Sequence, residues 1–290
     1  MVLSPPMARV VVTGGAGFVG SAVVDELRRA GDHVAIAGLG SASDPLNAGR
    51  LAEVITPNVD LIVHCAGSAS VSASVVDPTG EHAKTVPAFA LLLDRVRNHA
   101  PGARVVLLSN AAVYGNTAIV PTPETAALAP VSPYGEDKRA CEELCRAHRG
   151  ATAIVRLFSV DGAGLRKQLL WDACKKASSG VPRFAGTGDE ERDWLHVSDA
   201  ASLIVLAAAH ATNDAPVING GAGVGVKVRE VVGQVCRELG TEPVFTGQPR
   251  AGDPPRYVAD ITHARELGWQ PRIDLVRGIA DYVTWFRAHA

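Results

Sequence analysis

Short apolar runs rich in β-branched residues recur along the first half of the chain, and segments with helical spacing separate them. The first run, Arg9–Thr13, precedes a turn and then residues 21–30, whose apolar positions keep a helical period until Gly31. Four further runs have the length and composition of buried strands: 33–37, 61–64, 104–108 and 151–155. This alternation predicts a doubly wound parallel sheet with right-handed crossovers, a Rossmann-type α/β fold.

A glycine-rich turn joins the first strand to the first helix. Gly14, Gly17 and Gly20 follow the strand directly. Glycines let the backbone approach a ligand closely, and the helix that follows offers N–H groups to a pyrophosphate. The strand–turn–helix order therefore predicts a dinucleotide site, formed by these glycines together with Phe18 and Val19.

The pattern becomes irregular and richer in Gly and Pro after Arg156. We therefore expect a loose tail over residues 1–8, a dinucleotide-binding domain over 9–159 plus about 194–219, and a smaller carboxyl-terminal lobe from 160–193 and 220–290. The stretch between the second strand and Asp60 is short, so we expect the sheet to be trimmed there.

The acidic residue that usually completes an NAD site is absent. It should stand about 20 residues after the glycines, where it holds the ribose hydroxyls. Gly38 and Leu39 occupy that place, and no Arg stands nearby to hold the 2′-phosphate of NADP. Ser41 and Ser43 could hydrogen-bond either cofactor, so the choice between NAD and NADP is open.

Tyr134 and Lys138 are four residues apart, about one helical turn, so the phenol and the ammonium should share a helix face. A nearby cation favours the phenolate and should lower the tyrosine pKa from its ordinary value of about 10. Such a pair can move a proton on and off a sugar or alcohol hydroxyl.

Seven motifs occur in order, at residues 13–20, 64–67, 109–115, 132–138, 192–199, 250–253 and 267–271. Together they resemble the extended short-chain dehydrogenase/reductase family, in its nucleotide-sugar epimerase/dehydratase group, over about residues 9–285. The resemblance implies an NAD(P)-dependent enzyme that transfers hydride at C4 of a nucleotide sugar. It also implies a homodimer in which the smaller lobe of each subunit binds the nucleotide sugar.

The resemblance assigns roles to individual residues. Tyr134 would accept or return the hydroxyl proton, and Lys138 would bind the nicotinamide ribose. Cofactor contacts would come from the glycine turn and from Ser41, Ala66, Gly67, Phe158, Tyr134 and Lys138. Substrate contacts would come from Ser109, Asn110, Ser159, Arg192, Arg250 and Asp253. The two arginines would hold the diphosphate, since a guanidinium forms paired hydrogen bonds with phosphate. We interpret His64 as a hydrogen-bonded structural histidine.

Asn110 departs from the family pattern, because it occupies the position of the usual catalytic Ser or Thr. An amide can donate to a carbonyl oxygen or accept from a hydroxyl, but it cannot relay a proton through a hydroxyl rotor. Ser109 is adjacent, yet neighbours in an extended segment point to opposite faces. Ala111 and Ala112 replace the acidic pair of sugar 4,6-dehydratases, which argues against a dehydratase.

Three functions fit these observations: a C4 epimerase, favoured here, an NADPH-dependent 4-ketosugar reductase, and a cofactor-binding relative without catalysis. The missing acidic residue at Gly38 supports the reductase, and Asn110 supports the non-catalytic relative.

Composition and charge argue against nucleic acid, membranes and metal ions as partners of this chain. Net charge is −2 without a basic run, which argues against a nucleic-acid surface, and the apolar runs are too short or mixed to span a membrane. Met1–Met7 lacks the features of a signal peptide, and five cysteines fit a reducing cytoplasm. Cys141 and Cys145 lack further His or Cys partners nearby, so we expect them to pack in the core and expect no metal site.

Overall fold

The computed structural model of the chain describes residues 7–38, 46–247 and 255–290. The chain forms two compact units. Unit 1 comprises Met1–Asn116, Ala127–Arg156 and Ala201–Ile218, and unit 2 comprises Thr117–Ala126, Leu157–Ala200 and Asn219–Ala290. The predicted cofactor contact Ser41 and the predicted substrate contacts Arg250 and Asp253 lie outside the described residues.

A six-stranded sheet of order β2-β1-β3-β4-β5-β9 is the framework of unit 1. Its strands are β1 (Arg9–Thr13), β2 (His33–Ala37), β3 (Leu61–His64), β4 (Arg104–Asn110), β5 (Thr152–Leu157) and β9 (Val217–Gly220). β1 pairs in parallel with both β2 and β3, and β3 pairs in parallel with β4. The predicted doubly wound parallel sheet is confirmed.

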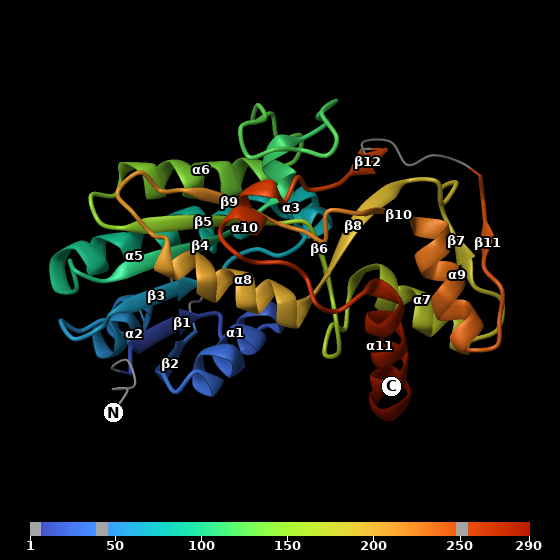
Figure 1. Cartoon of the computed structure of the whole chain (residues 1–290), viewed down its shortest axis with the longest axis horizontal. Helices are drawn as coiled ribbons and strands as arrows, with labels where there is room; N and C mark the ends of the chain where they lie inside the picture. The colour runs from blue at the N-terminus through green and yellow to red at the C-terminus, as the bar shows by residue number, and fades with distance from the viewer. Residues whose placement is uncertain (1–6, 39–45, 248–254) are drawn as a thin grey trace. The chain divides into compact units, whose positions relative to one another are not determined.

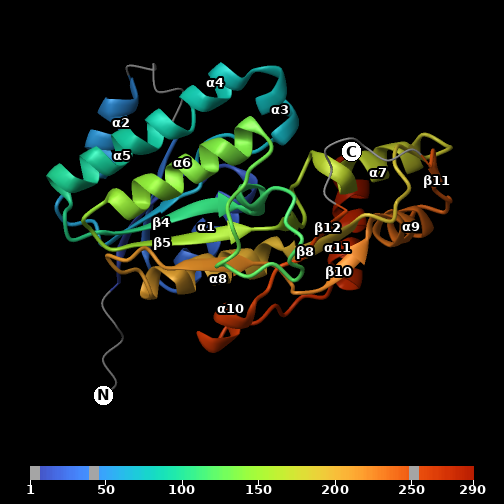
Figure 2. The same cartoon turned by 90° about the horizontal axis from the view of Figure 1, so that it is seen from above.

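Helices cover both faces of this sheet (Figures 1 and 2). α5 (Val86–His99) and α6 (Pro133–Ala147) lie on one face, and α1 (Phe18–Arg29) and α8 (Val197–Ala209) lie on the other. α5 buries four large side chains at helical spacing, Phe89, Leu92, Leu93 and Val96. These side chains join the valines of the central strands in one core, as do Cys141 and Cys145 of α6.

The connection from β2 to β3 is abbreviated. Its described part contains a single helix, α2 (Leu46–Val54), and no strand, so β2 is an edge strand of the described sheet. Three short elements follow between β3 and α6: α3 (Val71–Val76), α4 (Pro78–Ala83) and, after β4, the 3₁₀ helix η1 (Ala111–Tyr114). Among the described residues no further strand lies between β2 and β3, as the short connection predicted.

Unit 2 is built around β8 (Glu191–His196). β6 (Ser159–Asp161) and β12 (Arg256–Tyr257) pair with β8 in parallel, and β10 (Gly225–Lys227) pairs with it in antiparallel. β7 (Arg183–Phe184) and β11 (Val244–Phe245) form a separate pair. The helices α7 (Gln168–Ser178), α9 (Val228–Glu238) and α11 (Leu275–His289) pack on one another, and α10 (Thr262–Glu266) is a short helix that follows β12.

Two of the buried carboxylates of unit 2, Asp193 and Asp161, have different surroundings. Asp193 of β8 accepts hydrogen bonds from the backbone N–H groups of Ala222, Gly223 and Ala259, so its carboxylate ties two loops to the strand. Asp161 of β6 is 1% exposed, and no group among the described residues donates to its Oδ1. Burial, with the nearby charge of Asp199 adding to it, raises the pKa of Asp161 to about 7.

We expect Asp161→Asn to stabilise unit 2 in mild alkali. A carboxyl whose pKa is raised on folding contributes stability that is complete below its unfolded pKa, 3.8, and is lost as the pH rises through about 7. Removing the charge should therefore raise the free energy of unfolding by about 2–4 kcal/mol at pH 8 and by little at pH 4. Urea titrations at the two pH values measure this.

Asp193→Asn is the matched control, because it is also a buried Asp-to-Asn change. Burial also raises the pKa of Asp193, to about 6, although its carboxylate accepts three N–H groups. An amide would replace one of these accepting oxygens with a donor, so Asp193→Asn should raise the free energy of unfolding at pH 8 by less than Asp161→Asn does. An Asp161→Asn gain that is equal at pH 4 and pH 8 would contradict the assigned titration.

Candidate functional site

Two positions where β1 leads into α1, Gly14 in the turn and Gly20 in the first turn of the helix, accommodate only glycine. Gly14 has φ +69°, and a Cβ there would lie 2.7 Å from the backbone N of Ala66. A Cβ on Gly20 would lie 2.2 Å from the carbonyl oxygen of Gly14. Gly17 precedes α1 in an extended conformation and provides no side-chain cap, so Phe18 and Val19 begin the helix with N–H groups directed at the turn. A narrow backbone cradle results, suited to an anionic ligand.

The end of β3 lies against this cradle. Thr13 Oγ1 and His64 Nδ1 share a hydrogen bond of 2.8 Å, and the His64 ring lies 4.6 Å from that of Phe89. Burial, together with the charge of Lys138, lowers the pKa of His64 to about 3, so the ring is neutral at physiological pH. The structural hydrogen bond expected of His64 is present. Gly67, with φ +114°, turns the chain away after Ala66.

Tyr134 and Lys138 lie on the buried face of α6, in its first two turns. Ser132 caps the helix by accepting from Gly135 N, and Ser74 Oγ of α3 accepts from Tyr134 N at 3.1 Å. Lys138 Nζ donates to the carbonyl oxygen of Leu108 in β4 at 3.1 Å and lies 5.7 Å from the centre of the Tyr134 ring. The shared helix face predicted from the spacing is present.

The electrostatics of this pair differ from the sequence-based expectation. Burial raises the pKa of Tyr134 above its ordinary value, although a neighbouring cation alone would lower it. The phenolate loses its hydration in the protein interior, and the Lys138 ammonium is directed at a backbone carbonyl. Burial also lowers the pKa of Lys138, while Cys141, Cys65 and nearby carboxylates oppose that shift. In this chain the phenol therefore holds its proton at neutral pH.

Asn110 and Ser109 end β4 beside Lys138. Asn110 caps η1, because its Oδ1 accepts from Ala112 N at 2.9 Å. Ser109 is buried, and its hydroxyl donates to Glu142 Oε1 of α6 at 2.6 Å. The two neighbouring side chains thus have separate partners, and the Ser109 hydroxyl is committed to the α6 helix.

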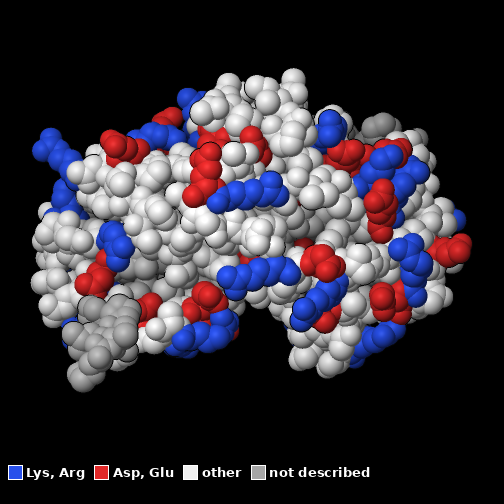
Figure 3. Space-filling view, in the orientation of Figure 1, with Lys and Arg blue, Asp and Glu red and all other residues white. Residues whose placement is uncertain are grey.

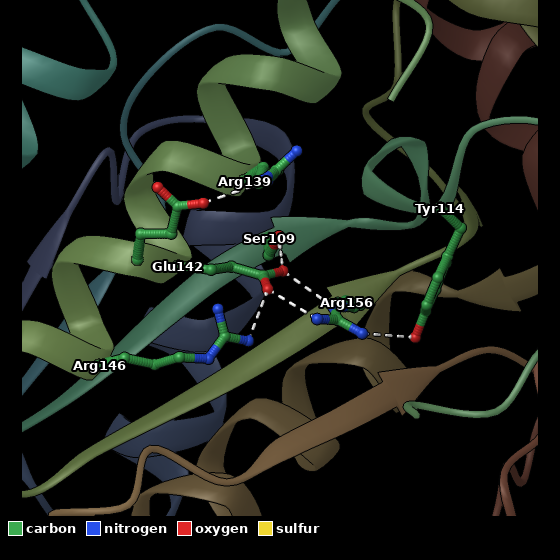
Figure 4. Close-up of polar contacts among 7 residues, drawn as sticks. Ser109, Tyr114, Arg139, Glu142, Arg146 and Arg156 are labelled. Carbon is green, nitrogen blue, oxygen red and sulfur yellow. Dashed lines mark hydrogen bonds and ion pairs between the residues drawn. The ribbon is translucent and has the colours of Figure 1, made fainter. Parts of the chain in front are cut away.

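A buried ion pair lies behind Ser109 (Figure 4). Arg156 of β5 donates to both oxygens of Glu142, at 2.9 and 2.7 Å, and to the Tyr114 hydroxyl at 2.8 Å. Arg146 donates to Glu142 from the half-exposed side of the helix at 3.1 Å. The sequence reasoning missed these residues, although Tyr134, Lys138 and Glu142 repeat every four positions and so lie on one face of α6.

Three predicted site residues lie in the described part of unit 2. Phe158 is buried, with its ring centre 5.7 Å from that of Tyr257. Ser159 begins β6 opposite Trp194, and Arg192 of β8 donates to its neighbouring carbonyl at Glu191. Unit 1 brings together Gly14, Gly17, Gly20, Ala66, Gly67, Asn110, Tyr134 and Lys138.

The surface charge on one face (Figure 3) and the arrangement of possible metal ligands show no further site in the described residues. On the face shown in Figure 3, acidic and basic side chains are interspersed. Within the described ranges, no group of three His, Cys, Asp or Glu side chains has the arrangement of a metal site, and no helix has the length and apolar character that crossing a membrane requires.

Comparison with known proteins gives consistent relatives over the whole chain. A UDP-glucose 4-epimerase from Azospirillum brasilense is 34% identical over 322 residues, which span 97% of this chain and 92% of the relative. The solved UDP-glucose 4-epimerase of Thermus thermophilus, in complex with NAD, has a TM-score of 0.87 at 25% identity, and the match covers 97% of this chain and 100% of that structure. MoeE5 in complex with UDP-glucuronic acid and NAD has a TM-score of 0.87 at 28% identity, with coverage of 98% and 100%.

The family model of the NAD dependent epimerase/dehydratase family matches residues 10–221. These residues include the glycine turn, the end of β4 and the α6 pair. The chain therefore belongs to the NAD dependent epimerase/dehydratase family, the family of enzymes that its motifs predicted.

Proposed function

We propose that this protein is an NAD-dependent nucleotide-sugar epimerase that inverts C4 by removing and returning a hydride. The observation that carries the proposal is the buried Tyr134–Lys138 pair on α6, which lies against the end of β4. The relatives named above include UDP-glucose 4-epimerases, which supports a UDP-sugar as substrate.

The cradle at Gly14 and Gly20 fits the pyrophosphate of a dinucleotide, because the absence of Cβ atoms permits the tight turn and a close approach of the ligand to its backbone. Ala66, Gly67, Ser41 and Phe158 are the further proposed cofactor contacts. The Thermus and MoeE5 structures contain NAD. Gly38 offers no carboxylate for the ribose, so the proposed preference for NAD over NADP depends on these relatives.

Tyr134 is proposed to accept the proton of the sugar O4 hydroxyl and to return it. Because burial raises the pKa of Tyr134, the phenol needs positive charge to release its proton. Lys138 supplies part of that charge. A bound oxidised dinucleotide would supply the hydride acceptor and a second positive charge.

Asn110 is proposed to hold the sugar oxygen rather than to move its proton. Its Oδ1 accepts from Ala112 N, and an amide nitrogen can only donate. Donation to O4 stabilises the carbonyl oxygen of a 4-ketosugar as it forms. Ser159, Arg192, Arg250 and Asp253 are the proposed contacts to the rest of the nucleotide sugar, and a cytoplasmic homodimer remains the expected assembly.

Two other functions retain specific support. A 4-ketosugar reductase that uses NADPH is favoured by Gly38, which lacks the acidic side chain that repels a 2′-phosphate. A relative that binds cofactor without turnover is favoured by Asn110.

A panel of UDP-, dTDP- and GDP-sugars separates the three. Epimerisation predicts C4 inversion without net cofactor consumption, measured by NMR of the sugar and by absorbance at the reduced nicotinamide band. Stoichiometric NADPH oxidation with a 4-ketosugar would instead establish the reductase. Binding without turnover across the panel would establish the third function.

Tyr134→Phe should lower turnover by about 10²–10⁴-fold, because it removes the group that transfers the proton. Retained cofactor, measured by mass on the purified protein, should be unchanged. Tyr282→Phe is the control, since Tyr282 is also buried and its hydroxyl donates to Leu165 O within unit 2. Full activity of Tyr134→Phe would refute this mechanism.

Asn110→Ala should lower kcat by about 10²–10³-fold, the loss expected for one donor to a developing oxyanion. Asn110→Ser should retain much more activity, because a hydroxyl can also donate to O4. Steady-state kinetics on the productive sugar measure both. Equal activity of Asn110→Ala and the unsubstituted protein would remove Asn110 from the mechanism.

Gly20→Ala should weaken NAD binding by about 5- to 150-fold, because overpacking the turn costs about 1–3 kcal/mol. Gly102→Ala is the control, since a Cβ there meets nothing within 4 Å. Calorimetric titration with NAD measures both, and circular dichroism checks that the fold is kept. Unchanged affinity in Gly20→Ala would contradict the assigned cradle.

A further inference from the structure

The buried face of α6 carries three polar side chains at a spacing of four residues, and two of them reach the end of β4. Lys138 Nζ donates to Leu108 O, and Glu142 Oε1 accepts from Ser109 Oγ. The helix that carries Tyr134 is thereby joined by hydrogen bonds to the two residues that precede Asn110.

Arg156 joins the other end of the same segment. Its Nη1 donates to the Tyr114 hydroxyl at 2.8 Å, and its guanidinium carbon lies 4.8 Å from the centre of the Tyr114 ring. Tyr114 is the last residue of η1, the short helix that Asn110 caps. Figure 4 shows Arg156 between Glu142 and Tyr114, and Ser109 at the same carboxylate oxygen, Oε1, that Arg156 Nε contacts.

We propose that Ser109, Tyr114, Glu142 and Arg156 form a clamp that positions Asn110 against the Tyr134–Lys138 pair. This inference rests on the proposed function and adds positioning residues to it. One ion pair holds the segment from both sides: Glu142 through Ser109, immediately before Asn110, and Arg156 through Tyr114, at the end of η1. Ser109 accordingly acts within the clamp and not on the substrate.

The Glu142–Arg156 ion pair is too deeply buried to be explained by a contribution to stability alone. Glu142 and Arg156 are 0% and 1% exposed, and taking two charges out of water costs about as much as their attraction returns. What the charges provide is direction, since a bidentate guanidinium–carboxylate pair has one preferred geometry. Burial alone would raise the pKa of Glu142, but Arg156 and the Ser109 hydroxyl lower it, so the pair is ionised at neutral pH.

Ser109→Ala and Tyr114→Phe test the clamp with little risk to the fold, because each removes one hydroxyl and leaves the Glu142–Arg156 ion pair intact. Each should lower kcat by about three- to tenfold, the effect of one hydrogen bond, with KM unchanged. Tyr282→Phe, which removes a buried tyrosine hydroxyl from unit 2, should leave kcat unchanged. Glu142→Gln is less informative, because a buried Arg156 without its counter-charge is expected to unfold the protein.

A double-mutant cycle separates positioning from general packing. If the clamp acts through Asn110, adding Tyr114→Phe or Ser109→Ala to Asn110→Ala should cause no further loss of kcat. Losses that multiply in the double variants, or an equal loss in Tyr282→Phe, would overturn the proposal.

Amide hydrogen exchange gives a readout that does not depend on turnover. Tyr114→Phe should speed exchange in peptides covering residues 108–116, and Tyr282→Phe should not. If the unsubstituted protein turns over no sugar of the panel, the proposed function fails while exchange still decides the clamp. Unchanged protection of residues 108–116 from amide exchange in Tyr114→Phe would then overturn the clamp.

Discussion

The attachment of one face of α6 to the end of β4 is the contact on which the rest of the site depends. Lys138 and Glu142 each direct a polar group across the helix–sheet interface, toward Leu108 O and Ser109 Oγ. Such bonds are stronger in the protein interior than in water, and leaving any of these groups unpaired would be costly. A shift of α6 along the sheet by a single residue would break both hydrogen bonds. The place of Tyr134 relative to the end of β4 is therefore set by Lys138 and Glu142, which follow it on the same helix face.

Burial shifts the pKa values of the two members of the Tyr134–Lys138 pair in opposite directions, and both shifts favour the neutral side chain. The phenol and the amine therefore each resist the charged form that the proposed mechanism needs. The neutral His64 at the end of β3 adds no compensating charge. Charge that arrives with a ligand would have a large effect in such surroundings, because it would be poorly screened. Reactivity would then be coupled to occupancy of the neighbouring glycine cradle.

Much of unit 1 was predictable because its signals are local. Runs such as Arg9–Thr13 combine β-branched composition with strand length, and the glycine turn and the 134–138 spacing lie within a few residues. The Glu142–Arg156–Tyr114 network was missed because it joins a helix, a strand and a turn that only the folded sheet brings together. The pKa of Tyr134 was anticipated in the wrong direction, since a spacing shows a neighbouring cation but not the depth of burial. Strands of two or three residues, such as β7 and β12, are too short to show a period.

The abbreviated connection after β2 leaves this strand at the edge of the described sheet. β2 pairs with β1 on one side, and on its other side no strand of the described chain covers its backbone groups. An edge of this kind is a template on which a second molecule could add a strand, and Ile36, 43% exposed, adds an apolar contact there. The template is only five residues long and ends before Gly38. An edge strand this short offers few backbone groups to a second molecule, so a sheet that ends at β2 has little tendency to aggregate edge to edge.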